Sequence, residues 1–106
     1  MSIKHIDVQT AKQWLDSGEA LLIDVREPVE HAALSIDGAK LAPLSRLSAE
    51  DVPAGESKKV IIHCKSGQRS QTACKQFMAA HPDVDIYNLE GGILAWQHAG
   101  HDVKKS

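Results

Sequence analysis

The sequence contains little of what several classes of protein require. It has only two cysteines, Cys64 and Cys74, which are too few for a disulfide-stapled scaffold. No stretch approaches the ~18 apolar residues of a membrane span, and residues 1–13 lack the apolar segment of a signal peptide. The formal net charge is -2, so the whole domain has no positive field that would hold nucleic acid. We therefore expect a cytoplasmic protein that binds neither membranes nor nucleic acid.

No internal repeat, low-complexity tract or linker divides the 106 residues. This length is close to the commonest domain size. Hydrophobic residues make up 42% of the chain and charged residues 25%, which is typical of a soluble globular protein with its own core. We expect a single domain over residues 1–106, in which residues 102–106 form a loose polar tail.

Short apolar runs predict the strands of this domain. Residues 21–25 and 60–64 are nearly continuous apolar runs, typical of strands that are buried on both faces of a parallel sheet. Weaker strands are predicted at 3–6, 39–41 and 85–89.

Helical patterns fill the intervals between these strands. Thr10 and Gln13 have the spacing of a capping box, which predicts a helix from Thr10 to about residue 16. Pro28 suits the first turn of a short second helix. A last helix is predicted at 92–99.

The longest helix is predicted at 68–80, where apolar residues recur at steps of three and four and Pro82 stops the pattern. This apolar stripe comprises Ala73, Cys74, Phe77, Met78 and Ala80. Strands that alternate with helices favour an α/β fold with a mainly parallel central sheet and helices on both of its faces. We predict such a fold and assign Cys74 to its core.

Cys64 lies at the end of the most apolar predicted strand, which is where ligands of open α/β sheets bind. The loop after it, residues 65–70, is polar, contains one glycine and turns directly into the long helix. Its backbone N–H groups and the helix N-terminus can form an anion cradle, to which Lys65 and Arg69 add positive charge. Because such surroundings lower a cysteine pKa from ~8.5 to ~3.5–7.5, we interpret Cys64 as a reactive nucleophile rather than a structural thiol.

At these residues the sequence resembles the rhodanese family. The run Cys64-Lys65-Ser66-Gly67-Gln68-Arg69 is similar to the active loop of members that use thiosulfate. Residues 24–26 with Glu30 resemble the family's first signature, and residues 89–96 resemble its C-terminal one. The resemblance covers nearly the whole chain and implies a rhodanese-like single domain. One departure lies at Leu34 and Ser35, where the family usually has Gly-His.

The resemblance implies a two-step sulfur transfer. The Cys64 thiolate attacks the outer sulfur of thiosulfate, expels sulfite and is left as a persulfide. A thiophilic acceptor then removes the sulfur, and cyanide, a small thiol or a thioredoxin-like protein would serve. Neither a metal nor an organic cofactor is implied.

The resemblance also assigns the rest of the loop to substrate binding. Lys65 and Arg69 would orient the sulfite-like group, and Gly67 would allow the backbone to approach it closely. The other loop residues would contribute N–H groups or hydroxyls. The predicted substrate-binding set is Lys65, Ser66, Gly67, Gln68, Arg69 and Ser70.

Other functions make different demands on the same loop. A persulfide carrier in a protein-to-protein sulfur relay would use Cys64 in the same way. A rhodanese-like binding module without turnover would be expected to lack this nucleophile. A cysteine-dependent phosphatase needs one residue more between its Cys and its Arg than the four that separate Cys64 from Arg69. The sequence therefore favours a thiosulfate sulfurtransferase and leaves the carrier as the alternative.

Two further predictions concern residues near the loop. His63 precedes Cys64 on a predicted strand, so we expect its side chain on the opposite face and assign it no role as a base. We expect a charge network that fixes the connection after the strand at 21–25, formed by Asp24, Arg26, Glu27 and Glu30. The six histidines show no metal-ligand spacing.

Overall fold

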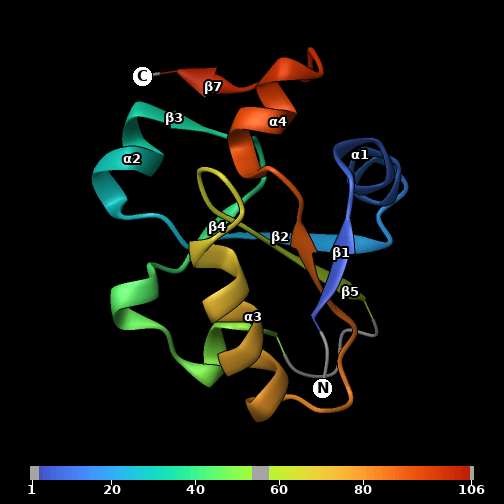
Figure 1. Ribbon diagram of the computed structural model, residues 1–106, viewed down its shortest axis with the longest axis vertical. Coiled ribbons are helices and arrows are strands. Elements are labelled where there is room, and N and C mark those ends of the chain that lie inside the picture. Colours follow the sequence, from blue (N-terminus) through green and yellow to red (C-terminus); the bar gives the residue numbers. More distant parts are fainter. Residues whose placement is uncertain (1–2, 54–57, 106) are drawn as a thin grey trace.

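The computed structural model describes residues 3–53 and 58–105, and at its centre is a five-stranded sheet (Figure 1). Every neighbouring pair of strands in this sheet is parallel, which confirms the predicted α/β architecture. Across the sheet the strands are β1 (Lys4–Ile6), β6 (Ile86–Leu89), β5 (Lys59–His63), β2 (Ala20–Asp24) and β4 (Lys40–Leu41). The most apolar run, β5, lies in the middle, where neighbours on both sides satisfy its backbone groups.

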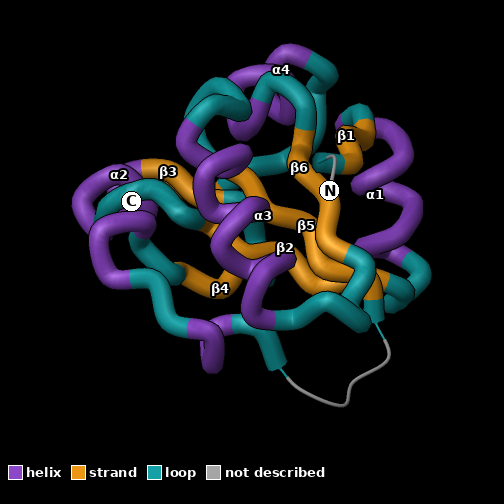
Figure 2. Tube along the Cα trace, turned by 60° about the horizontal axis from the view of Figure 1, so that its bottom comes forward, coloured by secondary structure: helices purple, strands orange, loops and turns teal. Residues whose placement is uncertain are grey.

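Helices cover both faces of the sheet, as predicted (Figure 2). On one face α1 (Val8–Asp16) and α4 (Gly92–His98) pack through Ala11, Ile93 and Trp96 against Leu22 and Ile61. On the other face α3 (Arg69–Ala80) packs against Ile23, Val60 and Ile62. The connection from β2 to β5 contains α2 (Pro28–Ala33), the short strands β3 (Leu34–Ser35) and β4, and the 3-10 turns η1 (Leu44–Arg46) and η2 (Ala49–Asp51).

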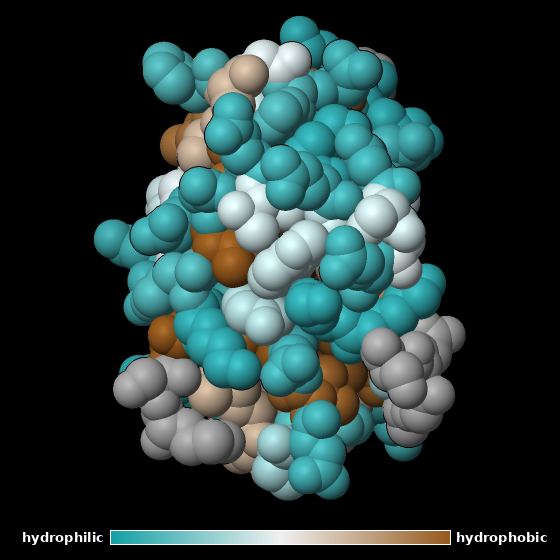
Figure 3. All heavy atoms as spheres, turned by 90° about the vertical axis from the view of Figure 1, so that its right-hand side faces the viewer, coloured by the Kyte–Doolittle hydropathy of each residue, from teal (hydrophilic) through white to brown (hydrophobic). Residues whose placement is uncertain are grey.

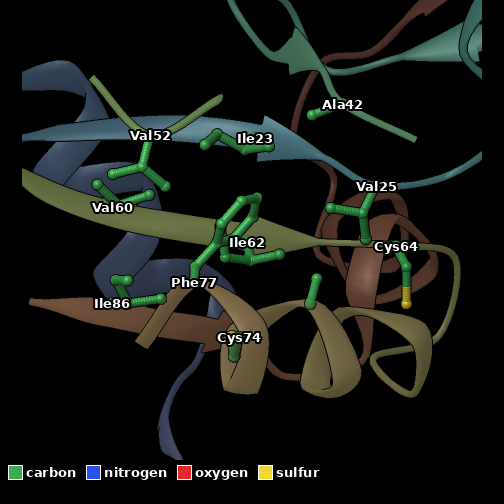
Figure 4. Close-up of a cluster of buried hydrophobic side chains, with 11 residues drawn as sticks. Ile23, Val25, Ala42, Val52, Val60, Ile62, Cys64, Cys74, Phe77 and Ile86 are labelled. Carbon is green, nitrogen blue, oxygen red and sulfur yellow. The ribbon is translucent and has the colours of Figure 1, made fainter. Parts of the chain in front are cut away.

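The apolar stripe of α3 lies beneath the centre of the sheet. Figure 4 shows Phe77 and Cys74 under the side chain of Ile62 on β5. Burial raises the pKa of the Cys74 thiol to about 12, which confirms Cys74 as a core residue. The prediction was wrong for Ala80, which is exposed, because the helix has by then run past the edge of the sheet. At the other end of α3 the polar Ser70 is buried instead.

The start of α1 differs from the prediction. Asp7 is the N-cap, and its carboxylate accepts the backbone N–H of Thr10 at 2.8 Å. The helix therefore begins at Val8, and the proposed capping box of Thr10 with Gln13 was wrong. An Asp at the N-cap satisfies the orphan N–H groups of the first turn, so the turn forms before Thr10 is reached.

The end of the chain is also better ordered than expected. Within the predicted loose tail over 102–106, β7 (Lys104–Lys105) pairs antiparallel with β3, and residue 106 lies outside the described residues. The indole N–H of Trp96 donates to the carbonyl of Asp102 at 2.9 Å, and Val103 packs against the apolar cluster beneath it. These contacts anchor the segment next to Leu34 and Ser35, the pair that departs from the usual family pattern.

Most of the surface seen in Figure 3 is hydrophilic, and apolar atoms are confined to small separate areas. Two large apolar side chains elsewhere are exposed among the described residues, Val29 and Leu94. None of the helices in the described part of the chain is long and apolar enough to cross a membrane.

Candidate active site

Cys64 follows the last residue of β5, and its side chain points toward the loop that leads into α3 (Figure 4). Only 1% of the residue is exposed. The Sγ atom accepts the backbone N–H of Gly67 at 3.1 Å and lies 3.4 Å from the hydroxyl oxygen of Ser70. The sulfur thus sits inside a ring formed by its own loop and the first turn of α3.

The first turn of α4 determines which way the loop peptides face. The N–H of Ile93 donates to the Cys64 carbonyl at 2.9 Å, and the N–H of Leu94 donates to the Lys65 carbonyl at 3.2 Å. The carbonyl of Gly67 is held by the side-chain amide of Gln71 at 3.0 Å. Since the two polar groups of a peptide unit point in opposite directions, the Lys65 carbonyl held by α4 leaves the N–H of Ser66 facing the sulfur.

Gly92 allows this close approach of α4. Its φ is +60°, and a Cβ atom built there would lie 2.5 Å from both the Cys64 and the Lys65 carbonyl oxygens. The neighbouring Gly91 is the N-cap of α4 and has a left-handed conformation. The paired glycines of the C-terminal signature therefore belong structurally to the active loop.

These contacts shift the ionisation of Cys64. Burial acts to raise its pKa, but the hydroxyl of Ser70 and the backbone N–H groups of Ser70, Gly67 and Ser66 stabilise the thiolate more strongly. The net result is a pKa below the ordinary value of a thiol. Hydrogen-bond donors therefore favour the thiolate form of this buried cysteine.

The two loop cations lie in different environments. The guanidinium of Arg69 donates to both carboxylate oxygens of Glu30 from α2, each at 2.8 Å. This ion pair lowers the pKa of Glu30 to about 2. Lys65 is exposed and makes no ion pair within the described residues. Of the two charges, that of Lys65 is therefore the freer to meet an anionic ligand.

The other loop residues divide into buried and exposed groups. Gly67 and Ser70 are buried against the sulfur, whereas Ser66 and Gln68 are exposed at the mouth of the loop.

Within residues 3–53 and 58–105, no group of three or more His, Cys, Asp or Glu side chains could hold a metal ion.

A buried ionic cluster lies behind the loop, at the end of β2. Arg26 binds Asp24 through two nitrogens and also donates to the carbonyl of Leu34 at 2.6 Å. His31 donates to the same carboxylate at 2.8 Å. Burial acts to raise the pKa of Asp24, but Arg26, His63 and His31 outweigh it and lower that pKa. The predicted charge network is present for Asp24 and Arg26, with His31 as an unpredicted member, and it ties α2 and β3 to the sheet. The prediction was wrong for Glu27 and Glu30, whose carboxylates accept from Ser45 and from Arg69 of the active loop instead.

His63 contacts the backbone of Cys64 rather than its sulfur. The Nδ1–H donates to the Cys64 carbonyl at 3.2 Å, and the ring is fully buried. Burial lowers the pKa of His63, so the neutral ring is favoured. Among the described residues its Nε2 has no hydrogen-bond partner, and it lies 3.9 Å from Asp24.

Two polar side chains that are linked to the sulfur by hydrogen bonds, Asn88 and His5, were not predicted from the sequence. Asn88 on β6 is 2% exposed and accepts the hydroxyl proton of Ser70. Its amide nitrogen in turn donates to Nδ1 of His5 on β1 at 3.1 Å. The one signal in the sequence is a polar residue inside the apolar run 86–89, and it does not indicate which partner Asn88 would find.

The sequence is similar to a known protein family and to several known proteins. A family model described as "Rhodanese-like domain" matches residues 7–99. The uncharacterized protein slr1261 of Synechocystis is 39% identical over 98 residues, covering 92% of this chain and 54% of that protein. A protein of Allochromatium vinosum named sulfurtransferase is 33% identical over 99 residues and 92% of each chain. The chain thus spans about half of the first relative and most of the second.

A solved structure agrees with the fold. The crystal structure of a rhodanese-related protein from Thermoplasma volcanium superimposes with a TM-score of 0.80 at 26% sequence identity. The match covers 95% of this chain and 97% of that one.

Substituting Gly92 tests the orientation of the loop peptides. Gly92→Ala should push the Cys64 and Lys65 carbonyls away from α4, because its Cβ would clash with both. With fewer N–H groups facing the sulfur, the thiolate fraction at neutral pH should fall by about tenfold or more, since one pKa unit is a factor of ten. The thiolate can be measured by its ultraviolet absorbance against a Cys64→Ser blank.

The matched control is Gly100→Ala. Gly100 also has a positive φ of +86°, but a Cβ there meets nothing within 4 Å. This variant should lose about 1–2 kcal/mol of unfolding free energy from backbone strain alone and keep its thiolate. An unchanged thiolate in folded Gly92→Ala protein would contradict the proposed origin of the low pKa.

The ion pair of Glu30 and Arg69 predicts a pH-dependent stability. Because folding lowers the pKa of Glu30 from 4.5 to about 2, the pair's contribution is fully present above pH 4.5 and is lost as the pH falls toward 2. Both side chains are about a third exposed, so the contribution should be about 1 kcal/mol or less. Between pH 5 and pH 3, the free energy of unfolding measured in urea should decrease more for the wild type than for Glu30→Gln. Glu50→Gln, at an exposed site, should behave like the wild type; equal decreases in all three proteins would exclude the effect.

Proposed function

Since the chain belongs to the rhodanese-like domain family, we propose that it is a thiosulfate sulfurtransferase that carries sulfur as a persulfide on Cys64. The observation that carries this proposal is the position of Sγ at the centre of inward-facing N–H groups. Such a ring of donors stabilises negative charge on a bare thiolate and also on the terminal sulfur of a persulfide. The relative named sulfurtransferase, which the chain covers almost entirely, supports sulfur transfer as the reaction class.

In the first step the Cys64 thiolate attacks the outer sulfur of thiosulfate. A new S–S bond forms, the S–S bond within thiosulfate breaks, and sulfite leaves with the electron pair of the broken bond. In the second step cyanide, a small thiol or a thioredoxin-like protein attacks the outer sulfur of the persulfide, and the Cys64 thiolate is restored. Two displacements thus replace one direct transfer, and neither step needs an external oxidant or reductant.

The remaining loop residues have distinct roles in this proposal. Lys65 attracts the sulfonate-like end of thiosulfate to the mouth of the loop, where exposed Ser66 and Gln68 supply further polar groups. Gly67 and Ser70 contact the sulfur directly. Arg69 contributes through the part of its guanidinium that Glu30 leaves available.

A persulfide carrier remains the second candidate, and the surface around the loop favours it. Leu94 is 48% exposed and is bonded through its N–H to the Lys65 carbonyl. Val29 is 75% exposed and precedes Glu30, the partner of Arg69. Apolar side chains beside the loop would suit contact with a protein that accepts the sulfur. A carrier would load sulfur readily but turn over slowly with cyanide.

Intact mass tests the covalent step. After incubation with thiosulfate, the wild type should gain the mass of one sulfur atom and lose it on addition of cyanide. Cys64→Ser should remain folded and gain nothing, because it lacks the nucleophile. Cys74→Ser should still load, since Cys74 lies in the core. Sulfur loading of Cys64→Ser, or its absence from the wild type, would refute the proposal.

A donor assay tests the choice of thiosulfate. Thiosulfate should be preferred to mercaptopyruvate, and an aryl phosphate should not be hydrolysed. Arg69→Gln should lower kcat/KM for thiosulfate roughly ten- to a hundredfold, because a charge-assisted hydrogen bond contributes about 1.5–3 kcal/mol.

The double variant Glu30→Gln with Arg69→Gln is the control for charge, since it preserves the net charge of the pair. If Arg69 contacts thiosulfate, the double variant should be as impaired as Arg69→Gln. Recovery of wild-type activity would mean that Arg69 acts only by neutralising Glu30. A clear preference for mercaptopyruvate would contradict the assigned donor.

A further inference from the structure

An unbroken line of hydrogen bonds connects the buried sulfur of Cys64 to the exposed His5. The Cys64 thiol donates to the Ser70 hydroxyl oxygen at 3.4 Å, and Ser70 donates to Oδ1 of Asn88. Nδ2 of Asn88 donates to Nδ1 of His5 at 3.1 Å. His5 and Asn88 occupy facing positions of the parallel strands β1 and β6, so the sheet itself fixes this contact.

This direction of donation suits the thiol and not the thiolate. A serine hydroxyl has a single proton to donate. While Asn88 accepts that proton, Ser70 can only accept from the sulfur. A thiolate, in contrast, needs Ser70 as a donor, and this contact helps to lower the pKa of Cys64. The Asn88 amide and the thiolate therefore compete for the same proton.

We infer that Asn88 is a positioning residue whose amide orientation, set by His5, decides whether Ser70 donates its proton to the sulfur of Cys64. Asn88 lies outside the active loop, yet it controls the ionisation of Cys64. The biological role of this control rests on the proposed sulfur transfer.

The line of hydrogen bonds can run in either direction without leaving a group unpaired. Rotating the Asn88 amide by half a turn brings Nδ2 to the Ser70 oxygen and Oδ1 to His5. Ser70 then donates to the thiolate, and Oδ1 accepts a proton from Nδ1 of His5. The proton released by Cys64 passes to the solvent, and His5 supplies an N–H at Nδ1 either by changing tautomer or by taking up a proton from the solvent. Both states are fully hydrogen-bonded, so small changes at His5 can select between them.

His5 is placed to exchange protons with water. It lines a polar hollow of about 340 Å³ together with Asn88, Gln71 and residues 66–68 of the loop. Glu90 is the other titratable group that lines this hollow. The ionisable groups near the sulfur include Lys65 of the loop, buried His63 on β5 and the core thiol Cys74, together with Arg69 on α3, which is paired with Glu30 of α2.

A pH titration of the Cys64 thiolate, followed by its ultraviolet absorbance against a Cys64→Ser blank, tests the inference. Asn88→Ala frees the Ser70 hydroxyl to donate to the sulfur, so the midpoint should shift to lower pH by about half to one unit, the effect of one hydrogen bond. Ser70→Ala should shift the midpoint upward. In a Ser70→Ala background, Asn88→Ala should have no further effect. An equal shift in both backgrounds would overturn the inference.

Variants at exposed His5 keep the test decisive if Asn88→Ala does not fold. His5→Glu offers only acceptors and should hold the amide in the observed orientation, whereas His5→Lys offers only donors and should favour the reversed one. The midpoint should therefore be higher in His5→Glu than in His5→Lys, and the difference should persist in about 1 M salt, where direct charge effects are screened. A difference that disappears in salt would show a purely Coulombic effect and refute the role of Asn88.

This titration is independent of sulfur donors. If the midpoints shift as expected but thiosulfate adds no mass to Cys64, the hydrogen-bond control stands and the proposed function fails. If sulfur loads normally while the midpoints do not depend on Asn88, only the inference about Asn88 is wrong.

Discussion

Two hydrogen bonds from the first turn of α4 to the carbonyls of Cys64 and Lys65 govern the rest of the site. The N-terminus of a helix has N–H groups without intrahelical partners, and here the active loop supplies the acceptors. The bond to the Lys65 carbonyl also turns the N–H of Ser66 toward the sulfur. One contact therefore satisfies the N–H groups at the helix end and builds the anion cradle. It depends on Gly92, because glycine is the only residue type that fits between the two backbones. Two segments almost 30 residues apart in sequence thus form a single structural unit.

The parallel sheet brings the remaining groups to this unit, because all its strands end on the same side. Cys64 follows β5, the Asp24 cluster closes β2, and Asn88 lies near the end of β6. The buried pair of Asp24 and Arg26 fixes geometry more than it adds stability, since taking both charges out of water offsets much of their attraction. Its second bond, to the Leu34 carbonyl, holds β3 where β7 can pair with it. A connection that would otherwise be a free loop is thereby made rigid beside the mouth of the site.

Local sequence patterns predicted the parts of the molecule that depend on local physics. The apolar runs located the strands, and the charged glycine loop after Cys64 indicated a reactive thiol before any tertiary contact was known. The predictions failed where a single side-chain contact decides the outcome. Asp7 displaced Thr10 as the helix cap through a single side-chain bond. The pairing of Glu30 with Arg69, and of Asn88 with Ser70, joins residues 39 and 18 positions apart, and no periodicity in the sequence encodes such pairs.

The order of the strands has a consequence for how the protein acquires its reactivity. Among the described strands, β1 pairs with β6 alone, so Lys4 cannot join the sheet until Tyr87 is in place. The anion cradle further requires Ile93 and Leu94. Contacts between such distant segments form late in folding, because closing a long loop is entropically costly. Until Ile93 and Leu94 hold the Cys64 and Lys65 carbonyls, the loop after Cys64 is not fixed in the conformation that stabilises the thiolate. The low pKa of this thiol is therefore a property of the completed fold rather than of the loop sequence alone.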